Sequence, residues 1–210
     1  NFNNDIGMPM AILGIPEDTE VAVLEMGMNH FREIAYLSNI AKPDVAVIIN
    51  VGTAHIEYLG SREGILQAKM EILEGLKPDG KAVFNGDDDM LTTVSPDGHP
   101  VTWYGIEGEN CLFAAKNVSL SESEIAFDAS YPDGETKVEL PFPGKHNVYN
   151  ALAAAAAGSF FGINAEDAFE ALKKYVPAGM RQRIVKKCGI TFIEDCYNAS
   201  PDSVKAGINT

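Results

Sequence analysis

Val45-Ala46-Val47-Ile48-Ile49-Asn50-Val51-Gly52 is the clearest secondary-structure signal in this chain. A continuous Val/Ile run, bounded here by Pro43 and Gly52, is typical of a strand buried on both faces of a parallel sheet. Strand-type runs also occur at residues 21–24 and 82–84, and helix-type spacing over 31–40 and 61–76 separates the three runs. This alternation predicts an α/β fold with a mostly parallel, doubly wound sheet.

The pattern changes after the acidic run at residues 87–89. Four alternating segments predict antiparallel strands in a side sheet packed on the main one. Helices are expected next, and Pro177-Ala178-Gly179 resembles a hinge, so we place a domain boundary near Gly179. Beyond it, two strands and a helix that begins at Pro201 are expected. The expected strands cover residues 101–104, 111–118, 125–129, 137–140, 183–187 and 190–194, and the expected helices 147–161 and 165–175.

The composition indicates a globular protein without a general affinity for polyanions. Of 210 residues, 46% are apolar and 22% charged, and the net charge is −14. This balance argues against binding of nucleic acid or anionic membranes, which need a basic surface. No run approaches the ~18–20 apolar residues of a membrane span, and we expect no secretory signal. Three cysteines without CxxC spacing predict buried thiols in a reducing cytoplasm.

Two loops that follow strand-type runs carry side chains suited to a divalent metal. Glu25 directly follows residues 21–24, and His55 lies five residues after Asn50. Such loops, at the carboxyl ends of parallel strands, are where α/β proteins bind ligands. A carboxylate at such a position suits Mg²⁺. The plainer alternatives are a solvated glutamate at a strand end and a structural histidine.

Further candidates are ambiguous when they are judged by residue type alone. Lys69 lies on an amphipathic helix and by itself indicates a surface lysine. Asn147 and Asn150 lie at a helix start, which suits an anion or an adenine edge, or ordinary capping by Asn147. Arg181 follows the hinge and could bind a phosphate, and Asp195 at a strand end could accept a ribose hydroxyl.

Two glycine-rich nucleotide motifs do not occur in the sequence. Without G-x-x-x-x-G-K-[ST], we expect any phosphate loop to lie upstream of Asn1. The chain opens without Met and closes inside a helix-type segment, so we expect it to be a piece of a longer protein. Without G-x-G-x-x-G after the first strand, a dinucleotide oxidoreductase is disfavoured.

Seven motifs occur in register with those of one enzyme family. They are Asn3-Asn4-Asp5-Ile6-Gly7-Met8-Pro9, Glu25-Met26-Gly27-Met28-Asn29-His30, Asn50-Val51-Gly52-Thr53-Ala54-His55, Ala68-Lys69-Met70-Glu71, Gly144-Lys145-His146-Asn147, Gly179-Met180-Arg181 and Asp195-Cys196-Tyr197-Asn198-Ala199-Ser200-Pro201. With these motifs the chain resembles the Mur ligases, ATP-dependent amide-forming enzymes of peptidoglycan synthesis. It is most similar to the branch that joins D-Ala-D-Ala to UDP-N-acetylmuramoyl-tripeptide.

The resemblance implies a fold and a set of roles. Residues 1–179 would be a P-loop NTPase-like central domain without its phosphate loop, and residues 180–210 the start of a Rossmann-like C-terminal domain. Two Mg²⁺ ions would be held by Glu25, His55 and a carbamylated Lys69. Asn147 and Asn150 would lie near adenine. Arg181 and Asp195 would contact phosphate and ribose. The UDP-sugar peptide would be contacted by Asn3, Asn4 and Asn198.

The resemblance also implies the chemistry. The tripeptide carboxylate would attack the γ-phosphate of ATP, and the amine of D-Ala-D-Ala would then displace phosphate from the acyl phosphate. Arg181 and Lys69 would assist at the reacting centre. We expect a monomeric protein, and we expect these 210 residues to be inactive by themselves.

Two alternatives remain open. The first is a sibling Mur ligase or a folylpolyglutamate synthase-like ligase, which the string at 195–201 disfavours. The second is an inactive nucleotide-binding module, which the joint presence of Glu25, His55 and Lys69 disfavours.

Overall fold

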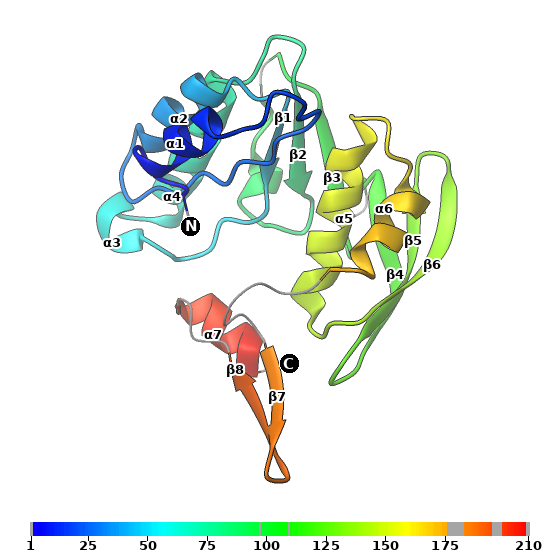
Figure 1. Cartoon of the computed structure of the whole chain (residues 1–210). Coiled ribbons are helices and arrows are strands. Elements are labelled where there is room, and N and C mark those ends of the chain that lie inside the picture. The colour runs from blue at the N-terminus through cyan, green and yellow to red at the C-terminus, as the bar shows by residue number, and fades with distance from the viewer. Residues whose placement is uncertain (1, 97, 109, 176–182, 195–198, 209–210) are drawn as a thin grey trace. The chain divides into compact units, whose positions relative to one another are not determined.

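The structure is a computed structural model that describes residues 2–96, 98–108, 110–175, 183–194 and 199–208. The strands are β1 (Val45–Ile48), β2 (Lys81–Asn85), β3 (Val101–Gly105), β4 (Phe113–Leu120), β5 (Ile125–Tyr131), β6 (Gly134–Leu140), β7 (Arg183–Lys187) and β8 (Ile190–Glu194). Within the described residues, β1 to β6 form one mixed sheet in sequence order, and β7 and β8 form a hairpin (Figure 1). This architecture confirms the predicted α/β class.

The chain forms two compact units, Asn1–Trp103 and Tyr104–Thr210. The helices of the first unit are α1 (Gly7–Leu13), α2 (Glu33–Ala41), α3 (Ile56–Leu59), α4 (Arg62–Met70) and the 3-10 turns η1 (Glu71–Glu74) and η2 (Leu91–Thr93). The helices of the second unit are α5 (Lys145–Ser159), α6 (Ala165–Leu172) and α7 (Pro201–Ile208). None of these described helices is both long and apolar enough to span a bilayer.

The two helices predicted in the first unit, over residues 31–40 and 61–76, correspond to α2 and to α4 with η1, whereas α1 and α3 were not predicted. At the end of α2, Lys42 adopts a left-handed conformation (φ 47°) and donates its N–H to the Ser38 carbonyl at 2.8 Å. Pro43, which lacks an N–H, follows immediately. At the start of α4, the Ser61 hydroxyl accepts the Gly64 N–H at 3.2 Å, as an N-cap serine does. Helix α4 runs directly into η1.

Strands β1 and β2 form the centre of the first unit. They pair in parallel, with Val45 opposite Lys81 and Ile48 opposite Phe84. Buried side chains of both strands pack with side chains of α3, α4 and η2 in one apolar cluster. The predicted strand over residues 45–51 is therefore correct in place but too long, because pairing ends at Ile48.

The strand predicted over residues 21–24 is not formed. This segment has no regular secondary structure, and none of the described strands pairs with it. Val21 is 45% exposed and Val23 95% exposed. An apolar run becomes a buried strand only where neighbouring strands and helices cover both of its faces, and here nothing described covers Val23.

Strands β3 to β6 belong to the main sheet and not to a separate side sheet. Strand β5 is antiparallel to β4 and to β6, as expected. Strand β3, however, is parallel to β4, with Tyr104 opposite Phe113 and Gly105 opposite Ala114. Alternation along a strand reports its two faces and carries no information on the direction of its partner.

The second unit packs alanine-rich α5 against β4 and β5. The buried positions of α5 include Ala151, Ala155 and Ala156, whose small side chains permit close approach. The predicted strands 183–187 and 190–194 are present and pair with each other, and the predicted helix starting at Pro201 is present. The predicted boundary near Gly179 lies outside the described residues. Cys188 is exposed at the hairpin turn, so the prediction of buried thiols is wrong for this residue.

Candidate functional site

The Glu25 loop is held by the start of the chain. Asn3 donates a side-chain N–H to Glu25 Oε1 at 3.0 Å, and its carbonyl accepts the Gly27 N–H at 2.8 Å. A Cβ at position 27 would lie 2.8 Å from the Asn3 side-chain nitrogen, so a larger residue there would displace the Asn3 side chain that binds Glu25. The structure thus brings together Asn3 and Glu25, which the sequence assigned to peptide and to metal.

Asn4 has a local structural role. Its Oδ1 accepts the N–H groups of Ile6 and Gly7 at 3.3 and 2.7 Å. Asparagine is a favoured residue at helix starts because its short side chain can accept free N–H groups. In this structure Asn4 therefore stabilises the first turn of α1, and its predicted contact with the UDP-sugar peptide stays a prediction.

Two carboxylates hold the backbone that follows Glu25. Glu33 Oε2 accepts the N–H groups of Asn29 and His30 at 2.7 and 3.2 Å. Burial opposes ionisation of Glu33, yet these N–H donors hold its pKa below the usual value. Glu71, only 7% exposed, accepts the N–H of Arg32 at 2.8 Å and that of Ala35 at 3.3 Å.

The second candidate loop ends at His55. His55 is exposed and has a left-handed backbone (φ 65°), and helix α3 begins directly after it. On α3, the ring of Tyr58 lies 5.1 Å from that of His30, centroid to centroid. This contact joins the loop after Glu25 to the segment after His55, although the strand expected before Glu25 is not formed.

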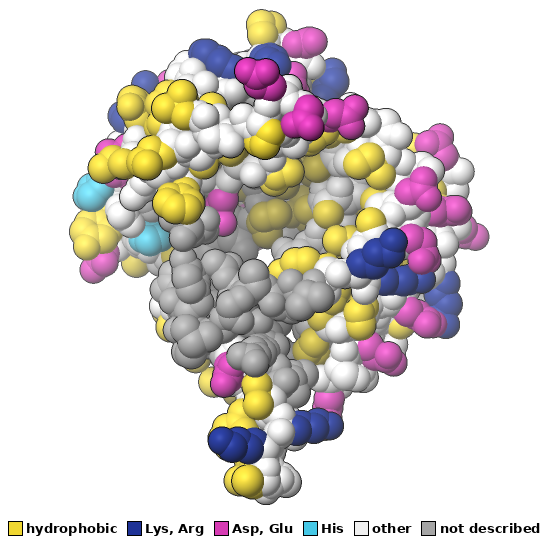
Figure 2. Space-filling model, viewed as in Figure 1, with side chains coloured by type: hydrophobic (Ala, Val, Ile, Leu, Met, Phe, Trp, Pro, Cys, Tyr) yellow, Lys and Arg dark blue, Asp and Glu magenta, His cyan; other side chains and the backbone are white. Residues whose placement is uncertain are grey.

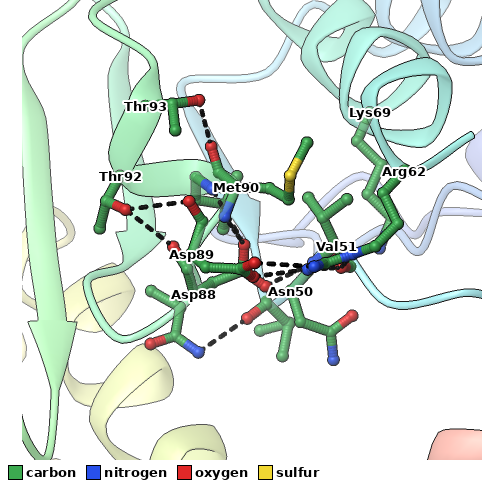
Figure 3. A network of polar contacts seen from close by, with 12 residues as sticks. Asn50, Val51, Arg62, Lys69, Asp88, Asp89, Met90, Thr92 and Thr93 are labelled. Carbon is green, nitrogen blue, oxygen red and sulfur yellow. Dashed lines mark hydrogen bonds and ion pairs between the residues drawn. The ribbon is translucent and has the colours of Figure 1, made fainter.

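The backbone just past β1 is bound by side chains instead of by a partner strand (Figure 3). The carbonyl of Ile49 accepts from Asn85 Nδ2 at 3.1 Å, and that of Asn50 accepts from Lys69 Nζ at 2.5 Å. The remaining contacts involve Val51, whose N–H donates to Asp88 Oδ2 at 2.7 Å and whose carbonyl accepts from Arg62 Nη2 at 2.8 Å.

Lys69 is half-buried beside this loop rather than on an open surface. Burial lowers the pKa of its ammonium group below the usual value, against the opposing attraction of the Asp88 carboxylate. The plain surface-lysine interpretation is therefore wrong. A lysine with a lowered pKa has a larger fraction of neutral amine, which is the nucleophilic form.

The donor set fits a metal that takes most of its ligands from elsewhere. Within the described part of the chain, no three His, Cys, Asp or Glu side chains converge on a possible metal position. Mg²⁺ in nucleotide sites commonly binds one or two protein groups together with phosphate oxygens and water. Glu25 and His55 are both exposed, which suits that mode of binding.

The surface charge around these loops is mixed. On the face drawn in Figure 2, acidic and basic side chains are interspersed. Within the first unit, Arg62 pairs with Asp89 at 2.5 Å and Lys77 pairs with Asp44 at 2.6 Å, and all four side chains are at least partly exposed. Exposed pairs of this kind contribute about 0–1 kcal/mol each to stability, so their main effect is on local geometry.

In the second unit, Asn147 and Asn150 are linked at the start of α5. Asn150 Nδ2 donates to Asn147 Oδ1 at 3.2 Å, and Asn147 Nδ2 donates to the Pro143 carbonyl at 2.6 Å. No side chain caps this helix at Gly144 (φ 98°). Ordinary capping by Asn147 is therefore not observed, and the pair lies at a helix start suited to binding a polar ligand.

Three predicted site residues, Arg181, Asp195 and Asn198, lie outside the described residues. Other residues of the site were missed by the sequence interpretation, chiefly Asp88, Arg62 and Glu71. The acidic run 87–89 directly after a buried strand was an available signal, because that position faces the ligand-binding edge of an α/β sheet. Nothing comparable marked Arg62, and Glu71 stood in the motif at 68–71 without an assigned role. The backbone partners of both residues are remote in sequence.

Comparison with protein families places this arrangement among known proteins. A family model described as the Mur ligase middle domain matches residues 1–158. The chain is 46% identical over 209 residues to a UDP-N-acetylmuramoyl-tripeptide--D-alanyl-D-alanine ligase of Bacillus subtilis (strain 168), covering 99% of this chain and 45% of that protein.

Solved structures agree with the sequence comparison. The crystal structure I of MurF from Acinetobacter baumannii superposes with a TM-score of 0.92 at 37% identity, covering 100% of this chain and 46% of that one. A Thermotoga maritima MurF ligase in complex with ADP gives a TM-score of 0.84 at 30% identity, covering 97% and 47%. The chain thus spans about half the length of the relatives it matches.

Proposed function

This chain belongs to the Mur ligase family, and we propose that it is the central part of a ligase that joins D-Ala-D-Ala to UDP-N-acetylmuramoyl-tripeptide. The observation that carries this proposal is the 46% identity with a ligase of that name along 99% of the chain. The Glu25 and His55 loops support it because His30 and Tyr58 join them and both candidate ligands are exposed.

We further propose ATP and Mg²⁺ as cofactors. A relative with 30% identity is described in complex with ADP. Glu25 and His55 would hold Mg²⁺, which when bound would neutralise phosphate charge during attack by the substrate carboxylate. Asn147 and Asn150 would contact adenine. The UDP-sugar peptide would be contacted by Asn3, Asn4 and Asn198. Arg181 and Asp195 would contact phosphate and ribose.

Lys69 would act as a carbamate. The ammonium group would first lose one proton. The neutral amine would then attack carbon dioxide, forming an N–C bond as one C=O π bond opens and releasing a second proton, so that a cation becomes an anion. The lowered pKa favours this reaction because it raises the neutral fraction at a given pH. The carbamate would keep one N–H, which could continue to donate to the Asn50 carbonyl, and its oxygens would be available as ligands for Mg²⁺.

In this proposal the chain's own residues orient the reactants. Asn3 would hold the Glu25 carboxylate in one rotamer through its hydrogen bond of 3.0 Å. The exclusion of water and the contacts of Arg181 would depend on domain closure, with a domain boundary near residues 179–180. We propose a monomeric, cytoplasmic enzyme, and we expect the 210 residues alone to be inactive, since they contain no G-x-x-x-x-G-K-[ST] loop.

The proposal is tested on the full-length protein with UDP-N-acetylmuramoyl-tripeptide, ATP and Mg²⁺. Phosphate release and amide formation are expected with D-Ala-D-Ala and absent with single amino acids or glutamate. Turnover with a single amino acid instead would assign the protein to a sibling ligase, and turnover with glutamate to a folylpolyglutamate synthase-like enzyme. No turnover, with no Mg²⁺-dependent nucleotide binding, would leave an inactive module.

A further inference from the structure

The carboxylate of Asp88 joins two segments that are remote in sequence. Its Oδ2 accepts the Val51 N–H at 2.7 Å, and its Oδ1 accepts the N–H groups of Met90 and Leu91 at 3.1 and 2.9 Å. Asp88 is 9% exposed and Val51 1% exposed. A buried carboxylate with three N–H donors is held in one orientation, because rotation would break bonds that water cannot replace.

Arg62 binds the backbone carbonyl of Val51, the residue whose N–H is bound by Asp88 (Figure 3). Its Nε and Nη2 donate to the Val51 carbonyl at 3.2 and 2.8 Å. Its Nη1 and Nη2 also donate to the two carboxylate oxygens of Asp89 at 2.7 and 2.5 Å. The planar guanidinium is suited to such simultaneous bonding, and it holds the pKa of the Asp89 carboxyl below its usual value.

These contacts fix the point from which the His55 loop departs. Both backbone groups of Val51 are bound by charged side chains, one from the end of β2 and the other from the start of α4. Gly52 follows at once, and His55 lies three residues after Gly52. The carbonyl just before Val51 is bound by Lys69, so the same short backbone segment contacts a second candidate ligand.

We propose that Asp88 and Arg62 are positioning residues that hold the Asn50–His55 loop in its metal-binding geometry. This inference rests on the proposed function, because it concerns the metal site assigned there. Neither residue needs to contact the substrate or the nucleotide. Their effect passes through the backbone of Val51 to His55.

The test uses the full-length protein and two measurements, one of which requires no activity. Hydrogen exchange of residues 49–55 is followed in the nucleotide-free protein. Binding of Mn²⁺ in the presence of ADP is followed by electron paramagnetic resonance. The variants are Arg62→Met, Asp88→Ala and the conservative Asp88→Asn, which keeps one acceptor oxygen.

Lys77→Met is the matched control. It removes the exposed ion pair with Asp44, which has the same type of contact at 2.6 Å but lies at the opposite end of β1. We expect Arg62→Met and Asp88→Ala to speed exchange of residues 49–55 at least tenfold and to weaken Mn²⁺ binding at least fivefold. Asp88→Asn should have an intermediate effect, and the control should have none.

Since Asp88 is buried, the Asp88→Ala variant can fail to fold. In that case the result for Arg62→Met decides whether the proposal holds. The Arg62 side chain is 34% exposed, so its loss leaves the apolar core intact. Unchanged exchange in Arg62→Met would overturn the proposal, as would faster exchange with unchanged Mn²⁺ affinity. If the wild-type protein binds no Mn²⁺ with ADP, the proposed metal site is wrong. The present proposal is then overturned as well, because it depends on that site, even if Arg62→Met speeds hydrogen exchange.

Discussion

The side-chain nitrogen of Lys69 lies 2.5 Å from the backbone carbonyl oxygen of Asn50 and donates a hydrogen bond to it. Helix α4 is thereby connected to the loop that carries His55. The bond also explains why a residue that resembles a surface lysine in the sequence is half-buried in the structure. The charge state of Lys69 is accordingly sensitive to its surroundings.

Lys69 is expected to make stability depend on pH in a defined direction. Its pKa is lowered in the folded protein, so between that pKa and about 10.4 the unfolded chain binds more protons than the folded one. Stability contributed by this group therefore rises with pH in that window. Urea unfolding of wild-type and Lys69→Met proteins from pH 7 to 10 checks this, and a difference that is constant with pH would contradict it.

A carbamate on Lys69 is expected to be visible by nuclear magnetic resonance. In the full-length protein equilibrated with ¹³C-labelled carbon dioxide, a carbamate signal should be present and should grow with pH, because only the neutral amine reacts. Lys69→Arg, which keeps the positive charge, is the control and should lack the signal. An identical spectrum for the two proteins would rule the modification out.

Removal of a proposed metal ligand should change the metal dependence of activity. In Glu25→Gln and His55→Ala, the Mg²⁺ concentration for half-maximal ligase activity should rise by about 10- to 100-fold, the range seen when metal-site groups are lost. Glu17→Gln, an exposed residue of the same unit, is the control. This concentration is measured from steady-state rates over a Mg²⁺ titration. If it is unchanged in a variant, the substituted residue is not a metal ligand.

Glu71 should matter more for stability than its neighbour Glu74. Glu71→Ala leaves the N–H groups of Arg32 and Ala35 without their acceptor, which should cost about 2–4 kcal/mol of unfolding free energy. Glu74 is exposed and pairs only at the surface with Arg32 at 2.6 Å, so Glu74→Gln should change stability by less than about 1 kcal/mol. Urea unfolding compares the two variants, and equal effects would refute the assignment.

Gly144 should not tolerate a side chain. Its φ of 98° is strained for other residues, and a Cβ would lie 2.5 Å from Cε1 of His146. Gly162 has a φ of 78° with no atom near the added Cβ, so Gly162→Ala reports backbone strain alone, about 1–2 kcal/mol. Gly144→Ala should be more destabilising than that in urea unfolding, and the reverse order would contradict the steric argument.

The wrongly predicted strand at residues 21–24 and the wrongly predicted pairing direction of β3 share one cause. Apolar periodicity describes the faces of a segment, but pairing depends on which other segments lie beside it. Residues 21–24 have strand-type composition, yet Val23 is 95% exposed. Likewise, β3 forms where the sequence predicts a strand, whereas its parallel pairing with β4 comes from the path of the chain between them.

The amino-acid sequence alone determined the α/β class, most helix and strand positions, and the loops that carry Glu25 and His55, because these depend on local periodicity, caps and turns. The tertiary structure decided what holds those loops. Val51 and Asp88 are 37 residues apart in the chain, and Arg32 and Glu71 are 39 apart. A carboxylate finds its backbone donors only after the strands and helices have packed, so no local pattern encodes such a pair.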